Sequence, residues 1–339
     1  MRTTLIYRAN RPTSLAWHCE ILGPLVLATT LYATIGNAQM VSDYPIKPVR
    51  VIVPTAPGAA TDLQARMLAQ KLSEHFKRPF VVENHPGAGN TAGYGIVAKA
   101  APDGYTLLAS SSGLTLIPVL RPDLGYDPLK DLAPISLVSM APFLLLVHPA
   151  FPAKSTKDLI SLAKRRPDAV AMGMANGSTT HLVSAWFASM AHIKILLVPY
   201  KGTGQVLVDT MAGQVQTLFG NVLATLSYVK SGRLNALAVS TAGRCSALPG
   251  LPTVSESGVS GFDVSAWHGW FAPAALLPAT VRSLNTSLAS AVKSPDVASK
   301  LAEDGGDPLG GSPEQLHKLI ASEVPRWRKV AYGAGMRLD

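Results

Sequence analysis

Short apolar runs alternate with amphipathic stretches through the first third of the chain. The runs are rich in valine and leucine and have the length of buried strands. In the first stretch between them Leu68, Leu72 and Phe76 share one face at helical spacing. We therefore expect strands at residues 48–54, 79–84 and 105–110 and helices at residues 63–76 and 91–101. This alternation predicts a mostly parallel α/β sheet.

A long apolar segment follows at residues 135–148, with Pro142 in its middle. It is too long for one ordinary strand, because strands are usually about 5–6 residues long. We interpret it as a segment that passes from one sheet to a second one.

Beyond this segment the alternation of helix and strand begins again. We expect helices at residues 158–167, 178–191, 204–213 and 222–232 and strands at residues 169–175, 195–200, 215–221 and 234–240. A proline- and glycine-rich segment, residues 248–262, leads to two further helices at residues 279–294 and 312–335. These last helices appear in the pattern without strands of their own, so we expect them to pack on the first sheet.

The chain thus crosses once to a second α/β unit and once back. This organisation predicts an α/β fold with two lobes, a hinge and a central cleft. We expect the first lobe to comprise residues 41–140 and 264–339 and the second to comprise residues 141–263.

The first 38 residues have the features of a cleavable export signal. Basic residues precede an apolar stretch at residues 21–35 that is short for a membrane span, and Gly36 and Ala38 offer a small-residue cleavage site. The alternative is an N-terminal membrane anchor, since the segment before the apolar stretch is long and contains Glu20. Cys19 lies before the apolar stretch rather than after it, which argues against a lipoprotein. We expect a periplasmic protein.

Charge and cysteine content narrow the possible partners. The net charge is +9, and removal of the leader leaves about +7. The basic residues are spread along the chain with one short run at residues 164–166, so a nucleic-acid partner is not expected, whereas a basic surface attracts anionic solutes. After the leader only Cys245 remains, so no intramolecular disulfide is possible. We expect a monomer.

Sequence signatures of enzymes and of cofactor sites are absent. The chain has no G-x-S-x-G, H-E-x-x-H, C-x-x-C or G-x-x-x-x-G-K-[ST] motif. The glycines of residues 87–93 are close to a dinucleotide fingerprint, but four residues separate Val82 from Gly87 and no ribose-binding acid follows the next strand. We expect no cofactor and no metal. A secreted hydrolase with a Ser-His-Asp site formed by tertiary proximity remains the alternative.

Two loops place small residues between a strand and the start of a helix. They are "PTAPGAATD" at residues 54–62 and "GMANGSTTHL" at residues 173–182, one in each expected lobe. Backbone N–H groups at a helix start have no partner within the helix and attract anions. Neither loop contains Lys or Arg. Together with the serines that end the strand at residues 105–110, they predict a pair of loops that close on a carboxylate.

The order of the motifs resembles the Bug family, the solute-binding proteins of tripartite tricarboxylate transporters. The resemblance runs from Tyr44 almost to the C-terminus and includes "YPIKPVRVIVPTAPGAATD", "VVENHPGAGNTAG", "AAPDGYTLL", "YDPLKDLAPISLV", "NGSTTHL", "VPYKGTGQVLVDTMAGQV", "ALPGLPTVSESG" and W-x-G-x-x-AP. It implies a non-catalytic periplasmic receptor of the two-lobed Venus-flytrap type. Such a receptor delivers a small carboxylate to membrane permease subunits or reports it to a signalling partner. The sequence leaves open aliphatic di- and tricarboxylates, aromatic carboxylates and amino acids.

The resemblance also implies the residues that contact the ligand. In the first lobe they are Ala56, Gly58, Ala59, Ala60, Asp62, Ser111 and Ser112. In the second lobe they are Asn176, Ser178, Thr179, His181, Tyr200, Gly202 and Asn221. His181 is either a hydrogen-bond donor to the ligand or a partner in capping its own helix.

Two positions depart from the family pattern. Ala59 stands where members usually have a second glycine, which adds a methyl group and restricts φ, so the shape of the loop is in question. Gly220 stands where many members have an aspartate. An acid at that position would serve an amino or hydroxyl group of the ligand, so its absence favours a plain carboxylate.

Overall fold

The first strand, β1 (Val49–Val53), lies at the centre of the first group of strands, and four of its five side chains are fully buried.

The computed structural model describes residues 44–87, 91–120, 125–127, 129–176, 178–303 and 305–333. The described helices and strands all lie in one compact unit within residues 45–339. The expected export signal, residues 1–38, lies outside the described residues. None of the described helices is both long and apolar enough to cross a membrane.

The alternation expected for the first part of the chain is confirmed. After β1 come α1 (Ala60–Phe76), β2 (Phe80–Asn84), α2 (Thr91–Ala98), β3 (Thr106–Ser111) and α3 (Gly113–Leu120). Strands β2, β1 and β3 are neighbours and run parallel. Gly93 of α2 lies against Pro54, where a Cβ atom would come within 2.8 Å of the proline Cβ. This close approach indicates that the glycine docks the helix on the end of β1.

The alternation expected after residue 148 is confirmed as well. The elements are α4 (Thr156–Arg165), β5 (Ala171–Ala175), α5 (Thr179–Met190), β6 (Leu196–Tyr200), α6 (Thr203–Met211), β7 (Thr217–Asn221), α7 (Val222–Lys230) and β8 (Asn235–Val239). Strand β5 pairs in parallel with β6 and β7. The carboxyl ends of these three strands therefore lie at one edge of the sheet.

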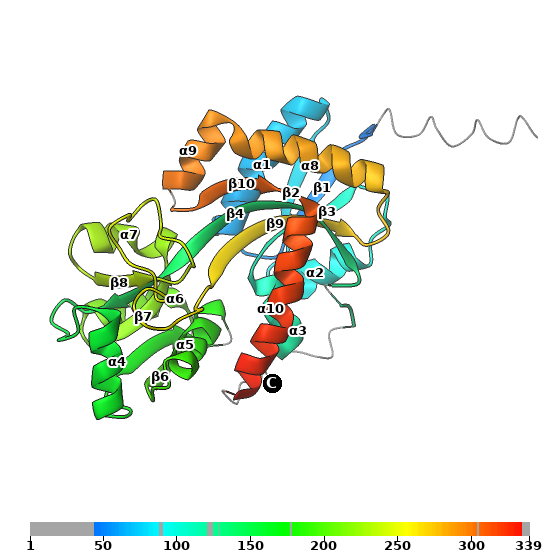
Figure 1. Cartoon of the computed structure of the whole chain (residues 1–339). Helices are drawn as coiled ribbons and strands as arrows, with labels where there is room; N and C mark the ends of the chain where they lie inside the picture. Colours follow the sequence, from blue (N-terminus) through cyan, green and yellow to red (C-terminus); the bar gives the residue numbers. More distant parts are fainter. Residues whose placement is uncertain are drawn as a thin grey trace, which may run out of the picture. The chain divides into compact units, whose positions relative to one another are not determined.

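One strand, β4 (Leu132–Val147), belongs to both groups of strands (Figure 1). Its first part pairs with β9 (Ser265–Pro273) as far as Pro142, and its second part pairs with β7 and β8 from Phe143 onward. The strand order is β2-β1-β3-β9-β4-β7-β5-β6, with β8 and β10 (Asp307–Gly311) paired to β4. The two groups of strands are thus continuous through β4.

The last part of the chain differs from the expectation in two ways. It contains two strands, β9 and β10, and a third helix, α9 (Pro295–Glu303), lies between the expected helices α8 (Pro278–Lys293) and α10 (Pro313–Gly333). Helix α10 packs on α3 and β4 and also on α5. The expectation that these helices bring no strands was wrong, because β9 is buried on both faces and so shows no period-2 alternation of apolar and polar residues.

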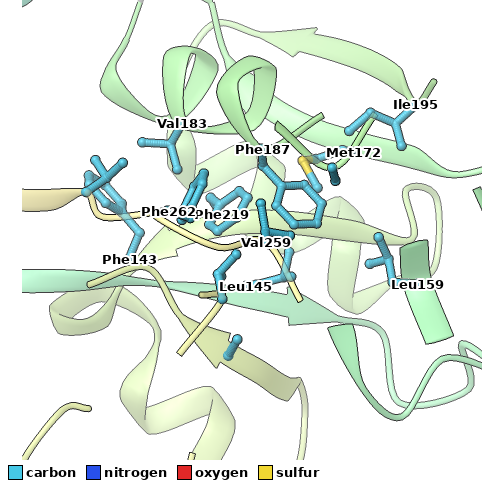
Figure 2. Close-up of a cluster of buried hydrophobic side chains, with 14 of the residues drawn as sticks. Phe143, Leu145, Leu159, Met172, Val183, Phe187, Ile195, Phe219, Val259 and Phe262 are labelled. Carbon is cyan, nitrogen blue, oxygen red and sulfur yellow. The ribbon is translucent and has the colours of Figure 1, made fainter. Parts of the chain in front are cut away.

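A large apolar core lies between β4, β5, β7 and helices α4 and α5 (Figure 2). Three phenylalanines form its centre, with ring centroids of Phe187 and Phe219 5.5 Å apart and those of Phe219 and Phe262 6.0 Å apart. Trp327 of α10 belongs to the same core and meets Trp186 of α5 edge-on at 5.7 Å. The C-terminal half of α10 therefore stabilises α5 by burial of aromatic surface.

Ser240 joins the two chain segments that run between the groups of strands. Its hydroxyl accepts a hydrogen bond from Phe143 N (2.8 Å) and donates one to Val264 O (2.6 Å). Its backbone N–H donates to Phe143 O, and its carbonyl accepts from Val264 N, both at 2.9 Å. Ser240 is fully buried, so these bonds have no competition from water.

We expect Ser240→Ala to lower the free energy of unfolding by about 1–3 kcal/mol, because it leaves the buried Phe143 N–H and Val264 carbonyl each short of a partner. Urea unfolding measures the change. Ser231→Ala is the matched control, since that hydroxyl is exposed and bonds only Tyr228 O at 3.2 Å; its effect should stay within about 0.5 kcal/mol. Equal effects of the two substitutions would contradict the role given to Ser240.

Candidate ligand-binding site

The loop between β1 and α1 leaves backbone N–H groups unpaired at the start of a helix of 17 residues. The N-cap residue, Ala59, makes no side-chain capping bond, and the first helical bond runs from Leu63 N to Ala59 O at 3.0 Å. The N–H groups of residues 60–62 precede that bond and receive no acceptor from the described part of the chain. This helix start therefore has the donors and the dipole that an anion needs.

The backbone of this loop suits its residues. Gly58 has φ +83°, a conformation that favours glycine, and it is exposed, as is Ala56. Ala59 has φ −69° and ψ 156°, which alanine adopts without strain. The alanine in place of the family's second glycine is therefore compatible with the loop, and Ala59 and Ala60 are half-buried beside the free N–H groups.

Asp62 has its carboxylate inside the loop. It accepts hydrogen bonds from Gly58 N (2.8 Å), Asn84 Nδ2 (2.9 Å) and Arg66 Nε (3.2 Å), and it forms an ion pair with Arg66 Nη2 at 3.0 Å. Burial opposes ionisation, but these donors hold the pKa of Asp62 below its ordinary value. The carboxylate that was expected to contact a ligand thus has three protein partners, and direct contact with a ligand stays a prediction.

Two residues at the end of β3 lie next to β9. Ser111 is half-buried and pairs in register with His268, and its hydroxyl has no partner among the described residues. Ser112 is buried; its N–H donates to Trp267 O at 3.0 Å, and its carbonyl accepts from the hydroxyl of Thr115. Ser111 is therefore the more accessible hydroxyl of this pair.

The helix start of α5 resembles that of α1. Its N-cap, Ser178, makes no capping bond, because the hydroxyl donates to Ala175 O (2.7 Å) and lies 2.8 Å from Thr180 Oγ1. The side chain thus shapes the turn and leaves the first N–H groups of the helix, from Thr179 onward, without a side-chain cap. Asn176 is exposed, and its N–H donates to Tyr200 O at 2.9 Å.

His181 lies in the first turn of α5 and is half-buried. Burial lowers the pKa of its imidazole, so the ring is neutral at pH 7. A neutral imidazole has one N–H donor and one acceptor nitrogen. Such a ring forms directed hydrogen bonds without adding a charge, and both roles expected of His181 stay predictions.

The remaining expected residues lie at the carboxyl ends of β6 and β7. Burial and a hydrogen bond with Asp209 raise the pKa of Tyr200. Gly202 is the uncapped N-cap of α6, with open space around its Cα. Asn221 Oδ1 accepts from Leu223 N at 3.0 Å and so caps α7, and its side-chain amide has no partner among the described residues.

Strand register places the end of β3, with Ser111, and the end of β7, with Asn221, near each other along β4. Ser111 pairs with His268 and His268 with Ser139 of β4, while Asn221 pairs with Phe143 of the same strand. Ser139 and Phe143 are four residues apart, or about 13 Å along a strand. The β3 and β7 ends are therefore held at neighbouring points of β4.

Two features of this region were not expected from the sequence. Arg66 and Asn84 bond Asp62, although neither belongs to the glycine-rich loop; the Asp62–Arg66 spacing of one helical turn was the available signal. At position 220 a Cβ atom would lie 2.5 Å from Thr225 Cγ2, so Thr225 fills the space that a side chain there would take. Among the described residues no cluster of three or more His, Cys, Asp and Glu is placed to hold a metal ion.

The chain matches a known protein family over most of its length. The family model described as "Tripartite tricarboxylate transporter family receptor" matches residues 64–336, which begin just after the first loop. BugT of Bordetella pertussis is 38% identical over 311 residues, covering 90% of this chain and 95% of that protein.

Two solved structures are also similar. The R. palustris protein Rpa4515, solved with adipate, is 36% identical with a TM-score of 0.75 and covers 87% of this chain and 99% of its own. MatC from Rhodopseudomonas palustris, solved with bound malate, is 31% identical with a TM-score of 0.71 and covers 85% and 99%. The predicted α/β fold of the two-lobed periplasmic-binding type and the resemblance to the Bug family are confirmed. Because the family model covers most of the chain and BugT shares more than a third of its residues, this protein belongs to the tripartite tricarboxylate transporter receptor family.

Proposed function

We propose that this protein is a periplasmic receptor that holds a small carboxylate between its two lobes. It delivers the carboxylate to the membrane permease subunits of a tripartite tricarboxylate transporter or reports it to a signalling partner. The observation that carries the proposal is the pair of uncapped helix starts, at Ala59 and Ser178, each at the carboxyl edge of parallel strands. Two related receptors solved with dicarboxylates, adipate and malate, support it.

The proposed contacts divide by chemistry. Backbone N–H groups at the starts of α1 and α5 hold one carboxylate, and polar side chains select the rest of the ligand. The proposed set is Ala56, Gly58, Ala59, Ala60, Asp62, Ser111, Ser112, Asn176, Ser178, Thr179, His181, Tyr200, Gly202 and Asn221. Among them Ser111, His181 and Asn221 have the side-chain groups best suited to direct hydrogen bonds.

We place the lobe boundaries within β4 and just before β9. Residues 41–140 and 264–339 form the first lobe, residues 141–263 the second, and ligand binding closes them. The change of β4 partners after Pro142 and the start of β9 at Ser265 support these boundaries. The packing of α10 on α5 adds a third connection, so closure has to rearrange or rotate about this aromatic contact.

The alternative, a secreted hydrolase, has weak support in the structure. Ser139 Oγ lies 3.5 Å from His268 Nδ1, but the hydroxyl donates its proton to Gln64 Oε1 at 3.1 Å. A Ser-His-Asp site needs a carboxylate bonded to the histidine, and none of the described residues supplies one to His268. Burial lowers the pKa of His268 to about 4, so this imidazole stays neutral.

Thermal unfolding with dicarboxylates tests the proposed function. A ligand that binds only the folded state stabilises it by about 2.7 kcal/mol at a hundred times Kd, and the shift grows with the logarithm of concentration. We expect adipate or malate to raise Tm, to be recovered unchanged, and to reduce the radius of gyration in small-angle scattering. The control is 1,6-hexanediol, which has the carbon chain of adipate and no carboxylate. A library of carboxylates without any stabilising member would refute the proposal, and consumption of the ligand would favour the hydrolase.

A charge at the N-cap of α1 tests the first loop. Ala59→Asp places a carboxylate beside the proposed ligand; at about 4 Å and an effective dielectric near 20 the repulsion is roughly 4 kcal/mol, or on the order of a thousandfold in affinity. The apo Tm should be unchanged or higher, because aspartate is a favoured N-cap. Ala59→Asn is the neutral control, which caps the same N–H groups without a charge. Calorimetric binding by the aspartate variant within about threefold of wild type would place the carboxylate elsewhere.

We further propose that residues 1–38 are a signal peptide removed on export to the periplasm. The basic start, the apolar stretch and Ala38 support this proposal. Intact-mass analysis of a periplasmic extract should find a chain that begins at Gln39. Recovery of the full-length chain from the membrane fraction would show instead that the segment is an anchor.

A further inference from the structure

The carboxylate of Asp62 is almost completely buried, with its side chain 2% exposed, in a loop proposed to bind an anion. An uncompensated negative charge at this place would repel the ligand. Arg66 removes the conflict: its Nε lies 3.2 Å from Oδ2 and its Nη2 lies 3.0 Å from Oδ1, an arrangement in which both carboxylate oxygens meet one guanidinium. The pair is neutral, and its positive member is half-exposed.

Asn84, at the end of β2, completes the arrangement. Its Nδ2 donates to Thr55 O (3.0 Å) and to Asp62 Oδ1 (2.9 Å), and its Oδ1 accepts from Arg66 Nη2 (2.8 Å). Asp62 in turn accepts from Gly58 N at 2.8 Å. The loop is therefore held at Thr55 by Asn84 and at Gly58 by Asp62. The three side chains that form this group come from α1 and from the end of β2.

These bonds supply an acceptor to the N–H of Gly58. The N–H groups of residues 60–62 have no acceptor among the residues that the structure describes. The loop is thus fixed without the use of its anion-binding donors. Donors that are already oriented bind an anion more tightly than donors that must be ordered on binding, since the entropy of the loop is lost beforehand. A buried charge with hydrogen bonds from the backbone is a strong way to fix such a loop.

We propose that Asp62, Arg66 and Asn84 form a clamp that preorganises the first loop for a carboxylate. In this clamp Arg66 is a positioning residue that cancels the charge of Asp62 rather than a direct ligand of the anion. This inference rests on the proposed function and deepens it. It accounts for an acidic side chain in an anion-binding loop, and it assigns roles to two residues outside the loop.

A charge-rescue experiment separates this role from a purely structural one. Arg66→Gln leaves the Asp62 charge uncompensated, and we expect the affinity for adipate in calorimetry to fall by about tenfold or more. The double variant Asp62→Asn/Arg66→Gln is neutral again and should bind adipate more tightly than Arg66→Gln alone. Arg165→Gln removes an exposed positive charge on α4 and is the control, expected to bind within about twofold of wild type.

The apo protein gives a second measurement that needs no ligand. We expect amide exchange at Gly58 to be slow in wild type and at least about tenfold faster in Asn84→Ala. The substitution removes the hydrogen bonds from Asn84 to Thr55 O and to Asp62, whose carboxylate accepts from Gly58 N. Failure of all carboxylates to bind wild type would refute the proposed function while the exchange result still tests the clamp. Wild-type affinity in Arg66→Gln, or a double variant no better than Arg66→Gln, would overturn the role of Arg66. Unchanged exchange at Gly58 would overturn the role of Asn84.

Discussion

The N–H groups at the start of α1 can bind an anion only if nothing in the protein binds them first. This constraint explains the composition of the loop, since small residues at positions 56–60 supply no hydroxyl or carboxylate that would cap the helix. It also explains why Asp62 accepts from Gly58 rather than from the helix start. The buried strand β1 then carries the loop on a rigid support, because its last three side chains are fully buried.

Strand β4 transmits this support to the second part of the fold. It pairs with β9 and β10 before Pro142 and with β7 and β8 after it, so both groups of strands share one backbone. Next to this change of partners, Ser240 bonds Phe143 of β4 and Val264, the residue before β9. These bonds limit how far β4 and the segment before β9 can slide past each other. Motion at this place is therefore more compatible with twisting of paired strands than with opening of a flexible linker.

The sequence was sufficient for most of the fold because short buried strands and amphipathic helices alternate from β1 to β8 with clear turns between them. It was insufficient where tertiary contacts decide: strand β10 has the sequence DPLGG, which has no apolar pattern, and it exists through its pairing with β4. The same limit applies to the candidate site. The two helix starts were evident from the loops at residues 54–62 and 173–182, because unpaired N–H groups follow from local sequence. The partners of Asp62 were not evident, since Asn84 reaches it only through the pairing of β1 with β2.

A neutral first loop has a consequence for selectivity. With Arg66 committed to Asp62, attraction at α1 comes from backbone dipoles, which act on any carboxylate of suitable shape and lose strength within one helical turn. If the first loop holds the ligand as proposed, it distinguishes a carboxylate from other groups better than it distinguishes one carboxylate from another. In the proposed site, discrimination between acids would then fall to side chains that form directed and uncharged hydrogen bonds, such as the neutral His181 and the amide of Asn221. A receptor arranged in this way can change its preferred acid through substitutions at the second set of residues while the clamp around Asp62 stays the same.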